Sequence, residues 1–124
     1  MKKIHSTSLS WNIRDKILLL ENLEMYVSAG LMLDEALRIS SGLFSAKQNK
    51  VLIQVHVHVS QGNLLSSAFA KYIQFSPTLI ALIEHGEHSG NLIQSLRMAR
   101  MVMERQDILI KACLSALTYP IVIA

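Results

Sequence analysis

Apolar residues recur along this chain at intervals of three and four, the spacing that places side chains on one face of an α-helix. The clearest case runs from Asn12 to Gly30. Its apolar face comprises Leu19, Leu23, Tyr26 and Val27, and its polar face comprises Glu21, Glu24 and Ser28. This pattern predicts an amphipathic helix that ends at Gly30, because glycine suits the left-handed conformation of a helix C-cap.

Signals for helix starts divide the rest of the chain into five further segments. Ser45 and Gln48 form a capping box, and Ser76 precedes a proline at the first helical position. Asn63 and Asn91 are expected to cap two more helices. The predicted segments are 33–41, 45–61, 63–71, 76–88 and a last one from 91 onward. The sequence therefore predicts an all-α fold, a six-helix antiparallel bundle whose last helix runs toward a transmembrane segment.

One segment also fits another pattern. From Val51 to Val59, β-branched residues alternate with other residues, which is close to the period of two that indicates a β-strand. No other part of the chain alternates, however, and a lone strand would leave its backbone groups without partners. Because Leu52, Val55 and Val59 also fit a helical stripe, we expect a helix here.

Three glycines occupy similar places relative to the apolar residues that follow them. Gly30, Gly62 and Gly90 are each followed by Leu or Ile three residues later and by Ala or Leu six residues later. The intervals between them are unequal, which excludes a strict helical-hairpin repeat. The similarity predicts three turns of the same construction.

The composition narrows the class of protein. The 124 residues are 51% hydrophobic and 17% charged, with 2 prolines, which excludes a disordered or collagen-like chain and predicts a single domain. The net charge of +3 comes from scattered basic residues, so nucleic-acid binding has little support. The single cysteine, Cys113, cannot form an intramolecular disulfide and favours a reducing compartment.

The two ends of the chain differ in character. The first residues are basic but lack the apolar stretch of a secretory signal. After Lys111, the chain contains no charged residue. We interpret this run as the start of a truncated transmembrane helix, which needs about 20 apolar residues, with a buried core helix as the alternative. We expect an N-terminal tail over 1–11, a helical-bundle domain over 12–111 and the transmembrane start over 112–124.

Few residues suggest chemistry. His85 and His88 lie among acidic residues, but no third ligand accompanies them, so we expect a surface helix end rather than a metal site. The chain contains neither a phosphate-binding loop nor a nucleophile elbow. We therefore expect no enzyme, no catalytic residue and no cofactor. The methionines of the last helix, Met98, Met101 and Met103, are interpreted as core residues rather than as an adaptable binding surface.

The segment from Gly86 to Leu92 combines several helix-end signals. Gly86 would let a neighbouring helix approach closely, and Gly90 would form a left-handed C-cap. Asn91 would cap the next helix, and Glu87 would place an acceptor near the positive end of that helix. We interpret the segment as a rigid, architectural hairpin, with a direct partner contact as the alternative.

Five blocks of the chain together resemble the cytoplasmic repeat domain of the inner-membrane platform proteins of type II secretion and type IV pilus machines (general secretion pathway protein F-like). The most specific block runs from Gly86 to Leu92. The others are 23–37, 62–69, 75–77 and 119–120. The motif residues are Gly30, Gly62, Gly86, Glu87, Ser89, Gly90, Leu92, Tyr119 and Pro120. The family usually carries a longer N-terminal extension than this chain.

The resemblance implies the first cytoplasmic domain of a non-enzymatic inner-membrane protein, a six-helix bundle that precedes a transmembrane helix. It also implies partners: a cytoplasmic assembly or secretion ATPase, other inner-membrane components and pilins, with ATPase motion coupled to pilin insertion or extraction. The apolar surface of so small a bundle predicts a homodimer. The alternative function is a soluble helical DNA-binding or adaptor domain, supported by the basic balance and by helix-turn-helix geometry.

Overall fold

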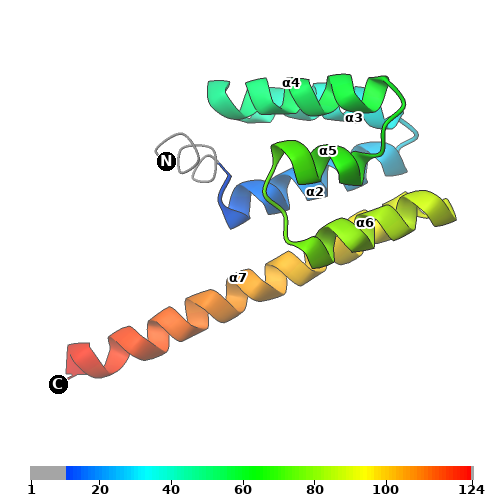
Figure 1. Ribbon diagram of the computed structural model, residues 1–124. Coiled ribbons are helices and arrows are strands. Elements are labelled where there is room, and N and C mark those ends of the chain that lie inside the picture. The colour runs from blue at the N-terminus through cyan, green and yellow to red at the C-terminus, as the bar shows by residue number, and fades with distance from the viewer. Residues whose placement is uncertain (1–10, 124) are drawn as a thin grey trace.

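The computed structural model describes residues 11–123, and it describes their side chains as far as residue 117. This part of the chain contains six α-helices and one short 3₁₀ turn, without a strand (Figure 1). Successive helices run in alternating directions, which confirms the predicted six-helix antiparallel bundle. The helices are α2 (Ile13–Ser28), α3 (Leu33–Ser40), α4 (Ala46–Ser60), α5 (Leu65–Tyr72), α6 (Pro77–Ser89) and α7 (Leu92–Ile123), with η1 (Ser41–Leu43) between α3 and α4.

The helices form a closed ring. Each one packs against its neighbours in sequence, and α7 also packs against α2. Figure 1 shows α3 beside α4 at one side of the bundle and α7 beside α6 at the other, with α2 and α5 between these two pairs. Helix α7 therefore closes the bundle with its first half and extends well beyond it with its second half.

One hydrophobic core fills the ring. Its largest fully buried side chains include Leu23, Leu37, Leu52 and Phe69, one from each of the first four helices. Phe69 packs against Phe75 of the α5–α6 connection, with ring centroids 4.7 Å apart. Trp11, which precedes the first helix, is 3% exposed and lies 5.1 Å from the ring of Phe44.

Helix α4 contains the segment with the alternating pattern. Leu52 and Val55 are fully buried on its inner face, whereas Ile53 and Val57 are exposed on its outer face. The predicted capping box is present at the start of the helix. The Gln48 side chain of this box also donates a hydrogen bond to the Asp15 carboxylate, at 2.8 Å, and so links α4 to α2. Capping and tertiary packing therefore outweigh the local β-propensity.

Helix α7 has 32 residues, and residues 108–117 are all exposed. In the part of the chain that the structure describes, none of the helices combines the length and the apolar character that a membrane span requires. Residue 124 and the side chains of residues 118–123 lie outside the described part. The expectation of a transmembrane start over 112–124 therefore stays a prediction.

Candidate functional site

Three left-handed glycine turns lie at one end of the bundle (Figure 1). Gly30, Gly62 and Gly90 follow α2, α4 and α6, with φ values of 99°, 94° and 75°. In each turn, the residue after the glycine donates its N–H to the carbonyl group five residues earlier, which satisfies a free carbonyl of the helix end. The three turns are therefore built in the same way, as the sequence predicts.

Gly86 lies where α6 and α7 pack closely against each other. A Cβ atom at this position would lie 2.0 Å from Ser95 Oγ and 2.4 Å from Ser95 Cβ, distances that real Cβ atoms do not show. It would also lie 3.0 Å from the Asn91 carbonyl oxygen, which belongs to the backbone and cannot move aside easily. The close approach of the two helices therefore requires glycine here.

Glu87 serves a different helix from the one we expected. We predicted that its carboxylate would lie near the start of α7. Instead, the carboxylate accepts hydrogen bonds from the backbone N–H groups of Leu65 and Ser66, at 2.5 and 3.0 Å. These residues begin α5, so the negative charge of Glu87 lies at the positive end of the α5 dipole.

This contact replaces a cap that α5 lacks. We expected Asn63 to cap this helix, but the N-cap position is Leu64, which provides no side-chain hydrogen bond. The Asn63 amide instead donates to the His58 carbonyl group, at 3.0 Å, and so completes the preceding turn. A side chain 21 to 22 residues away in sequence thus provides the acceptor that usually comes from the N-cap residue itself.

The family-motif residues on α6 and α7 therefore join three consecutive helices. Gly86 contacts α7, and its neighbour Glu87 holds the start of α5. Ser89 donates its hydroxyl group to the Gly86 carbonyl group at 3.4 Å, and Leu92 packs partly buried against the core. Tyr119 and Pro120 belong to α7, but the structure does not describe their side chains.

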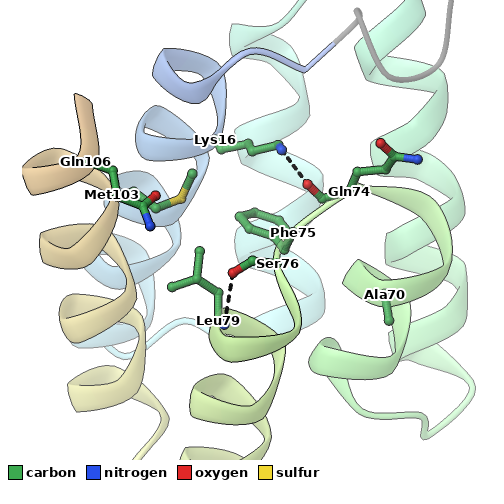
Figure 2. A pocket seen from close by; sticks show the side chains of 8 residues that line it. All are labelled: Lys16, Ala70, Gln74, Phe75, Ser76, Leu79, Met103 and Gln106. Carbon is green, nitrogen blue, oxygen red and sulfur yellow. Dashed lines mark hydrogen bonds between the residues drawn. The ribbon is translucent and has the colours of Figure 1, made fainter. Parts of the chain in front are cut away.

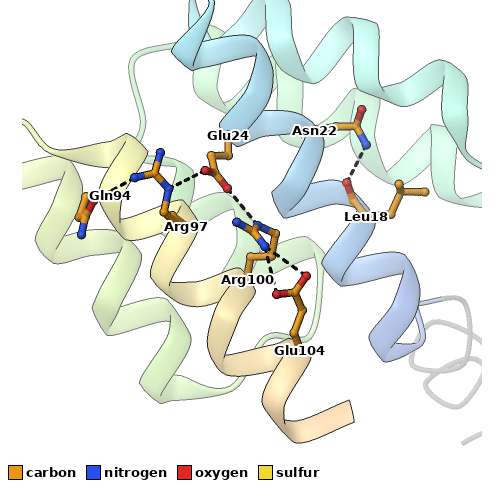
Figure 3. A network of polar contacts seen from close by, with 7 residues as sticks. All are labelled: Leu18, Asn22, Glu24, Gln94, Arg97, Arg100 and Glu104. Carbon is orange, nitrogen blue, oxygen red and sulfur yellow. Dashed lines mark hydrogen bonds and ion pairs between the residues drawn. The ribbon is translucent and has the colours of Figure 1, made fainter. Parts of the chain in front are cut away.

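A second polar cluster, which sequence reasoning missed, joins α2 to α7 (Figure 3). The Glu24 carboxylate accepts hydrogen bonds from Arg97 Nε at 2.8 Å and from Arg100 Nε at 3.0 Å. We expected Glu24 on the solvent face of its helix, but its side chain is only 13% exposed. The pattern in the sequence that could have indicated this pairing is the presence of two arginines one turn apart on the polar face of the last helix.

The cluster is electrostatically balanced. Burial disfavours the charged carboxylate of Glu24, but the hydrogen bonds and charges of Arg97 and Arg100 outweigh this effect and hold its pKa below the ordinary value. The hydrogen bond to Glu24 in turn raises the pKa of Arg100, which also binds Glu104 at 3.0 Å. The cluster secures α7 at the position where this helix closes the ring.

One face of α7 is apolar and exposed, and we call it the α7 stripe. It comprises Met98, Met101, Val102 and Leu109, which are 40% to 58% exposed. Together with Arg105 and Gln106, these residues line a shallow groove of about 320 Å³. Our interpretation of all three methionines as core residues is therefore wrong for Met98 and Met101. Only Met103, which is 4% exposed, lies in the core.

The described residues contain no group of three or more His, Cys, Asp or Glu side chains that could hold a metal ion. His88 Nε2 lies 3.6 Å from a carboxylate oxygen of Glu84, one helical turn away, and both side chains are more than half exposed. His85 is exposed on the same helix. The histidines of α6 thus lie at a surface helix end.

Comparison with known proteins places this arrangement in a family. The family model "Type II secretion system (T2SS), protein F" matches residues 19–124. The "Type IV pilus assembly protein PilC" of Thermus thermophilus is 30% identical over 112 residues, which cover 90% of this chain and 28% of the relative. The "Protein transport protein HofC homolog" of Escherichia coli is 30% identical over 125 residues, which cover 99% of this chain and 31% of the relative.

The chain spans less than a third of the length of these two curated relatives. The family match nevertheless includes every glycine turn, the Gly86–Leu92 block and all of α7. It favours the platform hypothesis over the DNA-binding alternative. The chain belongs to the type II secretion system protein F family, the platform proteins of type II secretion and type IV pilus machines.

Proposed function

We propose that this domain is a non-enzymatic part of an inner-membrane platform, with its helical bundle in the cytoplasm and the segment after Lys111 entering the membrane. Family membership supports this proposal. So do the names of the two relatives, of which one is a pilus assembly protein and the other a protein transport protein. The basic residues Arg105 and Lys111, just before the charge-free run, favour the cytoplasmic side for the bundle.

The observation that carries the proposal is the continuity of α7. Its first half is packed into the ring against α2 and α6, and the same helix continues without a break into the charge-free run after Lys111. At a rise of 1.5 Å per residue, its 32 residues span about 48 Å. Movement of the bundle would therefore be transmitted directly to the segment that enters the membrane.

In this scheme, a cytoplasmic assembly or secretion ATPase moves the bundle, and α7 transmits the movement to the membrane part, where pilins are inserted or extracted. The closed ring suits this role because it can move as one body.

The α7 stripe supports the expected homodimer, since pairing would remove its apolar side chains from water. Sedimentation velocity tests whether the domain forms a dimer. The Met101→Asp variant should sediment as a monomer, and a variant with the same mass as the parent would contradict the dimer.

Insertions after Lys111 in the full-length protein test the mechanical role of α7. Seven helix-forming residues add about two turns and keep the rotational register to within about 20°, whereas seven Gly and Ser residues break the helix. We expect both variants to reach the membrane fraction and to co-purify with the cognate ATPase. Only the helical insertion should support pilus or secretion function, and equal function of the flexible insertion would refute the proposal.

A further inference from the structure

A cavity of about 550 Å³ opens where α2, the α5–α6 connection and α7 meet (Figure 2). The α2 side contributes Lys16, and the connection contributes Gln74, Phe75 and Ser76. Met103 and Gln106 of α7 form the opposite wall. The cavity is thus lined by one cationic group, by polar side chains and by apolar side chains.

Lys16 is the unusual member of this group. It is half-buried, and its ammonium group donates a hydrogen bond to the Gln74 carbonyl group and lies 5.6 Å from the centre of the Phe75 ring. Neither partner carries a negative charge. Burial lowers the pKa of Lys16 because water is partly removed from the charged group. The bundle therefore holds a cation in a cavity without neutralising it.

Three acidic side chains of α2 and α7 are engaged elsewhere. Asp15 accepts from Gln48 at 2.8 Å, Glu104 accepts from Arg100 at 3.0 Å, and Asp107 pairs with Lys111 at 3.1 Å. The first ten residues contain neither Asp nor Glu, so their side chains add no carboxylate. Among the residues that the structure describes, no carboxylate pairs with Lys16, so a bound anion would supply the counter-charge that it lacks.

We propose that the cavity binds a phosphate group carried by a small organic molecule or by a phospholipid headgroup. Lysine binds phosphate as a point charge, and its ammonium group has three donors, of which Gln74 takes one. Ser76 Oγ accepts from the Leu79 N–H at 3.3 Å, which leaves its own O–H to donate to the phosphate. The Gln106 amide offers a donor from α7, and Phe75 and Met103 would contact the organic part.

The place of the cavity in the fold connects it to the membrane. Gln106 precedes Lys111 by five residues, which corresponds to about 7.5 Å along the helix axis. If the chain enters the membrane after Lys111, the cavity lies close to the level of the lipid headgroups. The inference that the phosphate group belongs to a lipid rests on the proposed function. The inference that the cavity binds a phosphate group does not.

Titrations of the 124-residue chain in a maltoside detergent, which contains no phosphate, test the proposal. We expect inorganic phosphate and glycerol 1-phosphate to shift the NMR signals of Lys16 and Gln106 and to raise the pKa of Lys16, because the anion offsets its desolvation. Flotation with vesicles of phosphatidylcholine, with and without phosphatidylglycerol, tests the lipid source.

Two substitutions locate the binding. Lys16→Gln removes the cation, and Gln106→Glu places a carboxylate on the opposite wall of the cavity, where it repels phosphate. Each should weaken binding by about tenfold or more, the order of a lost charge-assisted hydrogen bond. Lys47→Gln is the matched control, because it makes the same change of net charge at an exposed site on α4 and should change binding by less than about twofold. Thermal melts establish that each variant is folded.

The proposal is supported if the soluble phosphates bind and if both cavity variants weaken this binding. If flotation depends on phosphatidylglycerol and on Lys16, the phosphate group comes from the lipid. Absence of binding to every probe, or binding that survives both substitutions, overturns the proposal. Because these measurements need neither the ATPase nor a complete platform, phosphate binding and the proposed function can fail separately.

Discussion

Replacing Glu87 with alanine tests the long-range cap that joins α6 to α5. The substitution leaves the N–H groups of Leu65 and Ser66 without their acceptor, and both residues are buried. Loss of a helix cap costs about 0.5 to 2 kcal/mol, and each hydrogen bond to a charged group contributes about 1.5 to 3 kcal/mol. Because the two bonds share one carboxylate and the contributions are not additive, we expect a loss of about 2 kcal/mol.

A loss of this size is a large part of the roughly 5 to 15 kcal/mol that stabilises a typical domain, and it should lower the Tm by about 8 °C. Urea unfolding followed by circular dichroism measures the loss of unfolding free energy. Glu84→Ala is the matched control, since it removes the same side chain from an exposed position one turn earlier on α6, and it should unfold close to the parent. Glu87→Gln keeps one acceptor oxygen and should fall between the parent and the alanine variant.

A second change should restore part of the stability. Leu64 occupies the N-cap position of α5, and Leu64→Ser would introduce the acceptor that the helix lacks. In the Glu87→Ala background, this change should recover about 1 kcal/mol. If Glu87→Ala unfolds at the same urea concentration as Glu84→Ala, the carboxylate does not cap α5. If the Gln variant is stable but abolishes assembly in cells, Glu87 also contacts a partner.

Four further outcomes follow from features described above. Gly86→Ala should destabilise the bundle by about 1 to 2 kcal/mol in urea unfolding, because overpacking against Ser95 exceeds the gain in helix propensity, and Ser95→Gly should relieve the overpacking; an unchanged stability would contradict the close approach. Gly90→Val should cost about 1 to 3 kcal/mol in a thermal melt, since φ is 75° there, and a parent-like Tm would exclude this strain. The pKa of Glu24 is depressed in the folded state, so its contribution is present above the ordinary value of 4.5 and is lost as pH falls through the folded pKa. The difference in urea midpoint between the parent and Glu24→Gln should therefore shrink between about pH 6 and about pH 3, and a constant difference would refute this linkage. A reporter fused near Met1 should be active in the cytoplasm, and activity only in the periplasm would reverse the proposed orientation.

The helices were predictable where the signal lies within a few residues. The capping box of Ser45 and Gln48, the Ser76 cap and the glycine turns each involve residues no more than five positions apart. The true cap of α5 was not predictable in this way, because Leu65 and Glu87 are 22 residues apart and meet only when α5 and α6 pack together. The sequence pattern therefore predicted Asn63, the nearest residue with a suitable side chain, as the cap of α5.

Periodicity also failed to separate the two apolar faces of α7. Met103 and Met101 both fit helical stripes, but only the face toward α2 and α6 is covered. Which face is covered depends on how the ring closes, and this closure joins residues more than 70 positions apart, such as Glu24 and its partners Arg97 and Arg100. The Lys16 cavity has the same origin, since α2, α7 and the α5–α6 connection come together only in the assembled bundle.

The closed ring determines how the domain responds to a pulling force. A load applied along the axis of α7 acts in shear on two interfaces at once, with α2 on one side and α6 on the other. In shear, the contacts along an interface resist together, whereas peeling breaks them one after another. An open row of helices would leave α7 at an edge, held by one neighbour and free to peel away. Closure therefore makes the first half of α7 an anchor, so that a load reaches the other five helices together.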